Sequence, residues 1–176
     1  MKIIVAITGA SGVVYGARLV EELKKTKNEI FVIITKNAEK IAKYEDVKLP
    51  KATFGEDQID APIASGSFKV DGMIICPCSM KTMAAIANGY ANNLVVRSAD
   101  VMLKEKRKLI LALRETPINA IHLENALKLS RLGVQIMPVS PGFYHKPKKV
   151  KDVIDFFVGR ILDQLCVEHA LFKRWK

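Results

Sequence analysis

Cysteines, aromatic residues and long apolar runs are scarce in this chain. Its 176 residues include three cysteines, one tryptophan, four tyrosines and seven phenylalanines. Three cysteines suit a reducing compartment better than a disulfide scaffold. No apolar run reaches the roughly 18 residues of a membrane span, and the run at residues 3–7 is too short for a signal peptide. We therefore expect a cytoplasmic protein without a membrane span.

The spacing of the cysteines also argues against a metal site. Cys76 and Cys78 are separated by one proline, so they form no Cys-x-x-Cys pair, and no second pair completes a zinc site. A catalytic thiol is one interpretation of these residues. The favoured interpretation is that they are small residues at the end of a strand.

Acidic residues are in the minority, with 18 Asp and Glu against 28 Lys and Arg, a formal net charge of +10. Basic proteins attract nucleic acids, anionic lipids or anionic small molecules. Here the cations are scattered, and no aromatic–basic RNA signature accompanies them. Phosphorylated small ligands explain the charge as well as nucleic acid does, so a basic nucleic-acid-binding α/β domain stays an alternative.

Short apolar runs alternate with segments of helical periodicity along the whole chain. Such alternation with short connections predicts a doubly wound α/β domain with a mostly parallel sheet, and the length suits one domain over residues 1–176. Residues 46–70 are irregular. The expected strands are 2–7, 29–34, 70–76, 108–113 and 134–139, and the expected helices are 17–25, 38–43, 79–88, 93–106, 117–132 and 150–172.

The strand expected at residues 108–113 is followed at once by Arg114 and Glu115. Thr116 is the expected N-cap of the next helix, with Pro117 at its first position. Ligands of open α/β sheets bind outside the carboxyl ends of the strands. The pair is therefore either a surface ion pair in a loop or part of a site.

The first strand-to-helix turn contains Gly9, Ser11, Gly12 and Gly16. Glycines let a backbone approach an anion, and a helix start offers free N–H groups. The turn is neither G-x-G-x-x-G nor a P-loop, and Thr35 stands where an NAD-binding acid would be. It suits a mononucleotide phosphate or a flavin better than NAD, unless the glycines serve packing alone.

Two further segments could bind phosphate. Residues 79–82 would start a second helix beside the first turn, with Ser79 and Thr82 as hydroxyl donors, although Ser79 could be only an N-cap. Arg97 and Lys104 are seven residues apart and fall on one helix face. A ligand phosphate would pair with them; the alternative is a pair of solvent-facing side chains.

Taken together in this order, these stretches resemble the flavin prenyltransferases of the UbiX/Pad1 type over essentially the full length of the chain. The matching stretches are 7–12 (ITGASG), 65–68 (SGSF), 77–82 (PCSMKT), 97–104 (RSADVMLK), 114–117 (RETP), 122–124 (HLE), 138–147 with Phe143 and Tyr144, and 172–175 (FKRW).

This resemblance implies a flavoprotein-like Rossmann fold, with α/β/α layers, and a homo-oligomer that is a dodecamer in known members. It implies FMN as a bound substrate and dimethylallyl phosphate as the donor. The reaction would join the dimethylallyl group to N5 and C6 of reduced FMN without a metal. Prenylated FMN would then serve a UbiD-type decarboxylase of a ubiquinone or aromatic acid decarboxylation pathway.

Residue roles carry over by motif position. Glu115 matches the acid/base residue, Ser11 a second proton-handling hydroxyl, and Trp175 a residue of the C-terminal end near the site. Arg97 and Lys104 match catalytic cations. The implied FMN-binding residues are Gly9, Ala10, Ser11, Thr35 (usually Ser in the family), Ser79, Met80, Lys81, Thr82 and Arg114, and the implied ligands of dimethylallyl phosphate are Arg97, Lys104, Tyr144 and Arg160.

Two alternatives keep FMN but change the reaction. A flavin-dependent cysteine decarboxylase of the same superfamily would be expected to carry a catalytic histidine in the first strand–helix region. His122, His145 and His169 all lie elsewhere. The other alternative is a decarboxylase-associated subunit that only binds FMN. We interpret His122 and Glu124 as structural or interface residues.

Overall fold

The computed structural model describes residues 1–175. The chain forms two compact units, Met1–Pro138 and Val139–Lys176, which are taken in turn. Whether they make one domain stays a prediction. No helix within residues 1–175 is long and apolar enough to cross a membrane.

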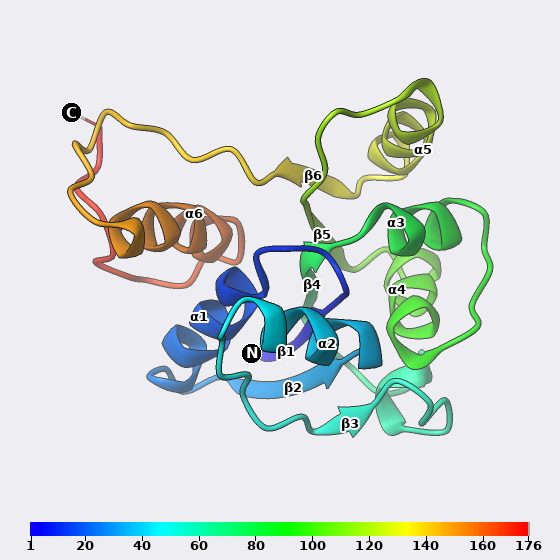
Figure 1. The fold of residues 1–176 in the computed structure, drawn as a ribbon. Coiled ribbons are helices and arrows are strands. Elements are labelled where there is room, and N and C mark those ends of the chain that lie inside the picture. Colours follow the sequence, from blue (N-terminus) through cyan, green and yellow to red (C-terminus); the bar gives the residue numbers. More distant parts are fainter. Residues whose placement is uncertain (176) are drawn as a thin grey trace. The chain divides into compact units, whose positions relative to one another are not determined.

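The first unit is built on a six-stranded sheet in the order β3-β2-β1-β4-β5-β6 (Figure 1). Every neighbouring pair is parallel, which confirms the predicted α/β class. Because β1 lies at the centre and the order reverses there, the strand ends on either side of it form a ligand crevice in such folds. The strands are β1 (Lys2–Ile7), β2 (Glu29–Ile34), β3 (Phe54–Gly55), β4 (Gly72–Cys78), β5 (Lys108–Leu113) and β6 (Gln135–Pro138).

The central strands are apolar because both faces of the sheet are covered. Ile3 to Ile7 of β1 are fully buried, as is every residue of β4. One core cluster joins these strands to the helices α3 (Met80–Ala87) and α4 (Leu94–Lys104) through Met73, Met83 and Val95. Gly16 on α1 allows the helix to approach β4 closely, since a Cβ there would lie 2.1 Å from the carbonyl oxygen of Cys76.

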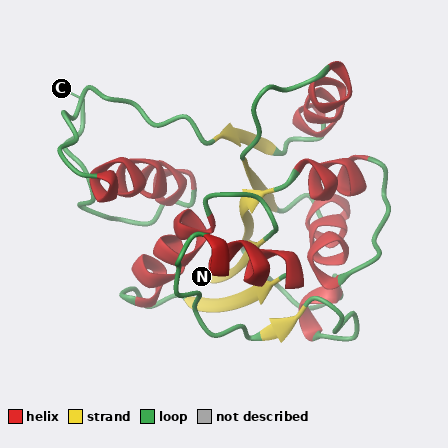
Figure 2. Ribbon diagram, viewed as in Figure 1, coloured by secondary structure: helices red, strands yellow, loops and turns green. Residues whose placement is uncertain are grey.

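Side-chain caps fix where most helices of this unit begin. Thr35, Ser79, Asn93 and Asn119 each accept a backbone N–H at the start of α2, α3, α4 and α5. Figure 2 shows helices alternating with strands along this part of the chain. The helices are α1 (Val13–Lys24), α2 (Lys36–Tyr44), α3 (Met80–Ala87), α4 (Leu94–Lys104) and α5 (Ala120–Arg131), with a 3-10 turn at Pro62–Ala64.

The predicted N-cap Thr116 is wrong. Asn119 caps α5 instead, and the side chain of His122 accepts the N–H of Asn119 in return. This reciprocal capping box satisfies the N–H groups of Asn119 and His122 at the start of α5. Thr116 and Pro117 lie before this start and do not cap it. At the other end Gly133 (φ 87°) closes α5, as predicted.

The second unit contains α6 (Val150–Gln164) and the chain on either side of it. The predicted helix of residues 150–172 is too long. Cys166 adopts φ 56° and donates to Asp163 O, while Val167 donates to Leu162 O. These two bonds are the Schellman pattern that ends a helix, here with a cysteine in the place usually taken by glycine. The chain then returns along α6 as a loop.

Candidate active site

The carboxyl ends of β1 and β4 are tied together by Thr8. Its hydroxyl donates to Pro77 O (2.8 Å) and accepts from Ser79 N (2.9 Å), and its side chain is buried. This places the turn after β1 beside the turn that starts α3. The two predicted phosphate-binding segments are therefore neighbours at one edge of the sheet.

The N–H groups at the start of α1 are bonded by Glu45, a residue that the sequence did not single out. The Glu45 carboxylate accepts the N–H of Gly12 (2.7 Å) and the N–H of Val13 (3.1 Å). An anion thus sits at this helix start, as its N–H groups and partial positive charge favour. The amides of Gly12 and Val13 are used within the chain, and Gly12 (φ 91°) supplies the left-handed conformation of the turn.

The turn after β1 also touches the start of α2. A Cβ on Gly9 would lie 2.5 Å from the Asn37 Cβ, so only glycine allows this approach. Thr35 is buried, and its hydroxyl accepts the N–H of Ala38. Lys36 is exposed and pairs with Asp57, whose hydrogen bond raises the pKa of the lysine.

Ser79 and Thr82 form a hydroxyl pair at the start of α3. Their oxygens lie 3.0 Å apart, and Ser79 Oγ accepts the N–H of Thr82. Met80 and Thr82 are buried, while Lys81 is exposed. Ser79 is therefore an N-cap, as one interpretation predicted, and it can still serve a ligand with its remaining lone pair.

Arg114 brings the end of β5 to the first turn. Its Nε donates to Ser11 O at 3.1 Å, across 103 residues of chain. Glu115 is exposed, and its Oε1 accepts only the N–H of Thr116 among the described residues. No ion pair joins Arg114 and Glu115 in residues 1–175, so the surface-ion-pair interpretation gains no support. The carboxylate stands free to face a ligand.

The cysteines at the end of β4 are structural. Cys76 and Cys78 are fully buried, and burial raises the pKa of both thiols far above their ordinary value. A thiolate nucleophile is disfavoured there, which agrees with the favoured sequence interpretation. None of the three cysteines is in a disulfide.

Lys104 does not join this group within one chain. Arg97 donates to Ala64 O (3.1 Å) and to Asp100 (2.9 Å). Lys104 pairs with Glu105 and lies close to Gly66. The carbonyl oxygen of Gly66 accepts a hydrogen bond from Arg107 Nη2. Since Arg107 directly precedes β5, Lys104 lies at the amino end of the strand whose carboxyl end carries Arg114. The six residues of β5 separate the two ends by roughly 20 Å.

In the second unit, the ring of Tyr144 contacts the ring of Trp175 edge-on, with centroids 5.1 Å apart. Arg160 is exposed on α6 and pairs with Asp163 at 2.9 Å. A hollow of about 330 Å³ is lined by Tyr144, Trp175 and their neighbours. The family resemblance pointed to three of these residues, but not to Asp163.

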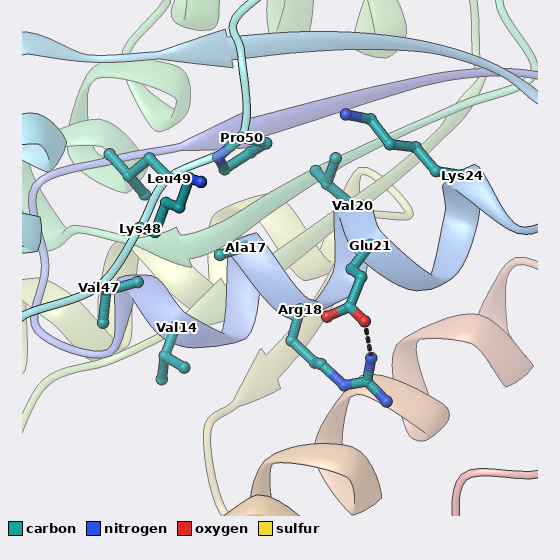
Figure 3. A pocket seen from close by; sticks show the side chains of 10 residues that line it. All are labelled: Val14, Ala17, Arg18, Val20, Glu21, Lys24, Val47, Lys48, Leu49 and Pro50. Atoms are coloured by element: carbon teal, nitrogen blue, oxygen red, sulfur yellow. Dashed lines mark ion pairs between the residues drawn. The ribbon is translucent and has the colours of Figure 1, made fainter.

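The first unit has a separate hollow of about 380 Å³ between α1 and the loop at residues 47–50 (Figure 3). Val14, Ala17 and Val20 face the loop at Val47–Pro50, and Arg18 pairs with Glu21 at the rim. None of the predicted site residues lines it. This hollow therefore does not mark the candidate site of the first unit; the convergence of polar groups does. Within residues 1–175, no three His, Cys, Asp or Glu side chains are grouped as for a metal ion.

Comparisons with known proteins identify the family of this chain. The Flavoprotein family profile matches residues 1–162. Flavin prenyltransferase UbiX of Methanocaldococcus jannaschii is 54% identical over 182 residues, covering 99% of this chain and 98% of the relative. The chain belongs to the UbiX family of flavin prenyltransferases. Mitochondrial flavin prenyltransferase PAD1 of Saccharomyces cerevisiae is 47% identical, covering 99% of this chain and 75% of PAD1.

Solved structures of UbiX proteins match the whole fold. AnUbiX (PadA1), crystallised with FMN and dimethylallyl pyrophosphate, gives a TM-score of 0.96 at 42% identity, over 99% of this chain and 97% of that one. A dodecameric FMN-dependent UbiX-like decarboxylase from Escherichia coli O157:H7 gives 0.94 at 43% identity, over 100% of both chains. The FMN-dependent cysteine decarboxylase SpaF, at 16% identity and 0.59, shares the fold alone.

Proposed function

We propose that this UbiX-family chain joins a dimethylallyl group from dimethylallyl phosphate to N5 and C6 of reduced FMN. The observation that carries the proposal is the hydrogen bond from Arg114 to Ser11 O. It draws the cation and the neighbouring Glu115 to the glycine turn and the hydroxyls of α3. Hydroxyls and a guanidinium are hydrogen-bond donors of the kind that a phosphorylated flavin requires.

The chain's own residues fit FMN in a specific way. Glu45 already holds the amides of Gly12 and Val13. Its negative charge would repel a phosphate from that helix start. The flavin phosphate would therefore be held mainly at the start of α3, by Ser79 and Thr82 with the exposed Lys81. Thr35 would add a hydroxyl from the start of α2, where the Glu56 carboxylate already accepts the N–H of Lys36 (2.8 Å). Gly9, Ala10, Ser11, Met80 and Arg114 would complete the FMN contacts.

Glu115 and Ser11 are the proposed proton-handling groups. Breaking the allylic C–O bond leaves the departing phosphate with more negative charge, and a proton must reach it. N5 must lose its proton as the N–C bond forms, which balances the proton taken up by the phosphate. A further proton must leave C6 as the C–C bond forms, which balances the proton gained by the allylic double bond. FMN supplies the nucleophilic nitrogen and one π face when bound. Glu115 is exposed at the strand end with one local hydrogen bond, so it can accept and donate a proton there.

Arg97, Lys104, Tyr144 and Arg160 are the proposed ligands of the dimethylallyl phosphate, with the cations stabilising the leaving phosphate. Lys104 lies at the far edge of the sheet from Arg114, so one chain does not bring Lys104 to Arg114 and Glu115. We propose that a second copy of the chain supplies Lys104, in a homo-oligomer that is most simply a dodecamer, as in the Escherichia coli relative.

Exposed apolar side chains around α5 support such an assembly. Leu129 is the one fully buried residue of α5, whereas five apolar side chains on and beside the helix are more than half exposed. Several large apolar side chains exposed on one helix are typical of a protein contact surface. The five are Ile118, Ile121, Leu123, Leu127 and Leu132.

The product would be consumed by a UbiD-type decarboxylase, and the cytoplasmic location expected from the sequence stays part of this proposal. A decarboxylase or decarboxylase-associated role is the second candidate, because the Escherichia coli relative is described as a decarboxylase. A nucleic-acid-binding role has no comparable support, since the cations of α4 are paired with Asp100 and Glu105.

The test is to mix purified protein, reduced FMN and dimethylallyl phosphate without added Mg²⁺ and to measure the mass and absorption spectrum of the released flavin. A flavin heavier by one dimethylallyl unit is expected. Well-folded, FMN-bound protein that yields unchanged flavin would overturn the proposal. Release of CO₂ from an aromatic acid by the protein alone would favour the decarboxylase.

Subunit mixing tests the shared site. Glu115→Gln protein and Lys104→Ala protein are each expected to be nearly inactive. When the two are unfolded together and refolded, some sites combine an intact Glu115 with an intact Lys104 from a different copy, so activity should return. Failure to regain activity in mixed oligomers would place both residues in one chain's site.

A further inference from the structure

The carboxylate of Asp163 on α6 gathers three basic side chains. Arg160 Nη1 donates to it at 2.9 Å, His169 Nε2 at 3.0 Å, and Arg174 donates twice, at 2.6 and 3.2 Å. The side chain of Asp163 is only 15% exposed. Two of its partners lie beyond the end of the helix, so the carboxylate holds the returning segment of the chain against α6.

The histidine contact has a defined direction. His169 Nδ1 accepts the N–H of Leu171 at 3.2 Å, so this nitrogen carries no proton. The proton of a neutral ring is then on Nε2 and is donated to Asp163. The imidazole, 3% exposed, thereby joins Asp163 to the backbone of the segment.

Close packing at Gly159 supports the same arrangement independently. A Cβ on this residue would lie 2.6 Å from Phe172 Cε1 and 2.7 Å from His169 Cε1. The segment thus lies directly on the backbone of α6, one residue before Arg160. Phe172 also packs on Phe156, with ring centroids 4.8 Å apart.

Trp175 is the last described residue of this segment, and its ring contacts the ring of Tyr144. Arg174, the residue before it, forms the two-pronged bond to Asp163. One carboxylate therefore fixes both the orientation of Arg160 and the place of Trp175. Burial would raise the pKa of Asp163, but the hydrogen bonds from Arg174 and His169 outweigh it and hold that pKa below its usual range. Asp163 is consequently charged at neutral pH.

We infer that Asp163 is a positioning residue for the donor substrate, which orients Arg160 toward the phosphate and anchors the segment that carries Trp175. The inference rests on the proposed prenyl transfer. Asp163 does not itself touch the substrate in this scheme. It acts through two neighbours, so its loss should affect the donor and leave FMN binding unchanged.

The chain contains one tryptophan, so tryptophan fluorescence anisotropy reports on Trp175 alone. In Asp163→Asn the anisotropy should fall, because the segment is released. The KM for dimethylallyl phosphate should rise at least about tenfold, the effect of losing one charge-assisted hydrogen bond, while the Kd of FMN changes less than about twofold. Glu168→Gln makes the same charge change on an exposed residue of the same segment and should alter neither quantity.

Unchanged anisotropy in folded Asp163→Asn would overturn the inference. Lower anisotropy with an unchanged KM would reduce Asp163 to a structural role and overturn it as a positioning residue. If Asp163→Asn does not fold, Arg174→Gln decides the matter, because Arg174 is 58% exposed and its loss should release the segment without unfolding the protein. Anisotropy needs no turnover, so an inactive wild type would refute prenyl transfer while leaving the anchoring test intact.

Discussion

The Glu45 carboxylate binds the backbone N–H of Gly12 at 2.7 Å, although 33 residues separate them in the chain. Glu45 is the C-cap residue of α2, and Gly12 is the N-cap of α1. The end of one helix therefore completes the start of another, directly beside the glycine turn. This contact holds the turn in shape and decides which amides a phosphate could reach.

Glu45→Gln should lower the free energy of unfolding by about 1–2 kcal/mol, the usual value of a helix N-cap together with its charge. The amide keeps one acceptor oxygen but presents an NH₂ group to a second donor. Urea unfolding without FMN measures the effect. Glu39→Gln, on an exposed residue of α2, is the matched control and should change stability by less than about 0.5 kcal/mol. Equal stability of the two variants would show that the contact contributes nothing.

Glu115→Gln should slow the formation of prenylated flavin by about 100-fold or more, the usual contribution of a general acid or base. The Kd of FMN should change less than about threefold, because Glu115 is exposed and bonds only to Thr116 N within the described residues. Single-turnover flavin mass and flavin fluorescence titration separate the two effects. A parallel loss of both would make Glu115 a structural residue of the loop.

Gly16→Ala should destabilise the protein by more than about 2 kcal/mol. The new Cβ would lie 2.1 Å from the carbonyl oxygen of Cys76, so α1 or β4 must move. At Gly55 the nearest atom to a Cβ would be an oxygen of the Gln58 side chain, 3.7 Å away, so Gly55→Ala should be nearly neutral. Thermal unfolding of the pair distinguishes close packing from a general effect of losing glycine.

Local sequence signals predict every strand of the sheet except β3, whose two residues lie in the irregular region 46–70. The apolar run of β5 was predicted with its observed bounds, Lys108–Leu113, and Ser79 was predicted at the start of α3. These elements follow from burial on both faces and from one capping side chain, which act over a few residues. The order of the elements in an α/β chain then leaves few possible topologies.

Long-range contacts could not be predicted in this way. Glu45 lies at the edge of an irregular region with no periodicity, so nothing in the sequence links it to Gly12. The end of α6 was missed because Cys166, a residue with no preference for positive φ, takes the usual place of glycine. Lys104 matched a family motif, yet the direction of α4 carries it away from Arg114, which only the folded chain reveals.

The exposed apolar side chains around α5 lead to a last prediction about assembly. Ile121 is 66% exposed, and a buried contact with another copy would explain why an apolar residue stands there. Ile121→Asp should lower the mass measured by light scattering toward that of a smaller assembly, since it places a charge in an apolar contact. Ile59 is 60% exposed on a loop, and Ile59→Asp should leave the mass unchanged. If the site is shared between copies, prenyl transfer should fall with the mass in the Ile121 variant. Full activity in the smaller species would mean that this surface serves assembly without completing the site.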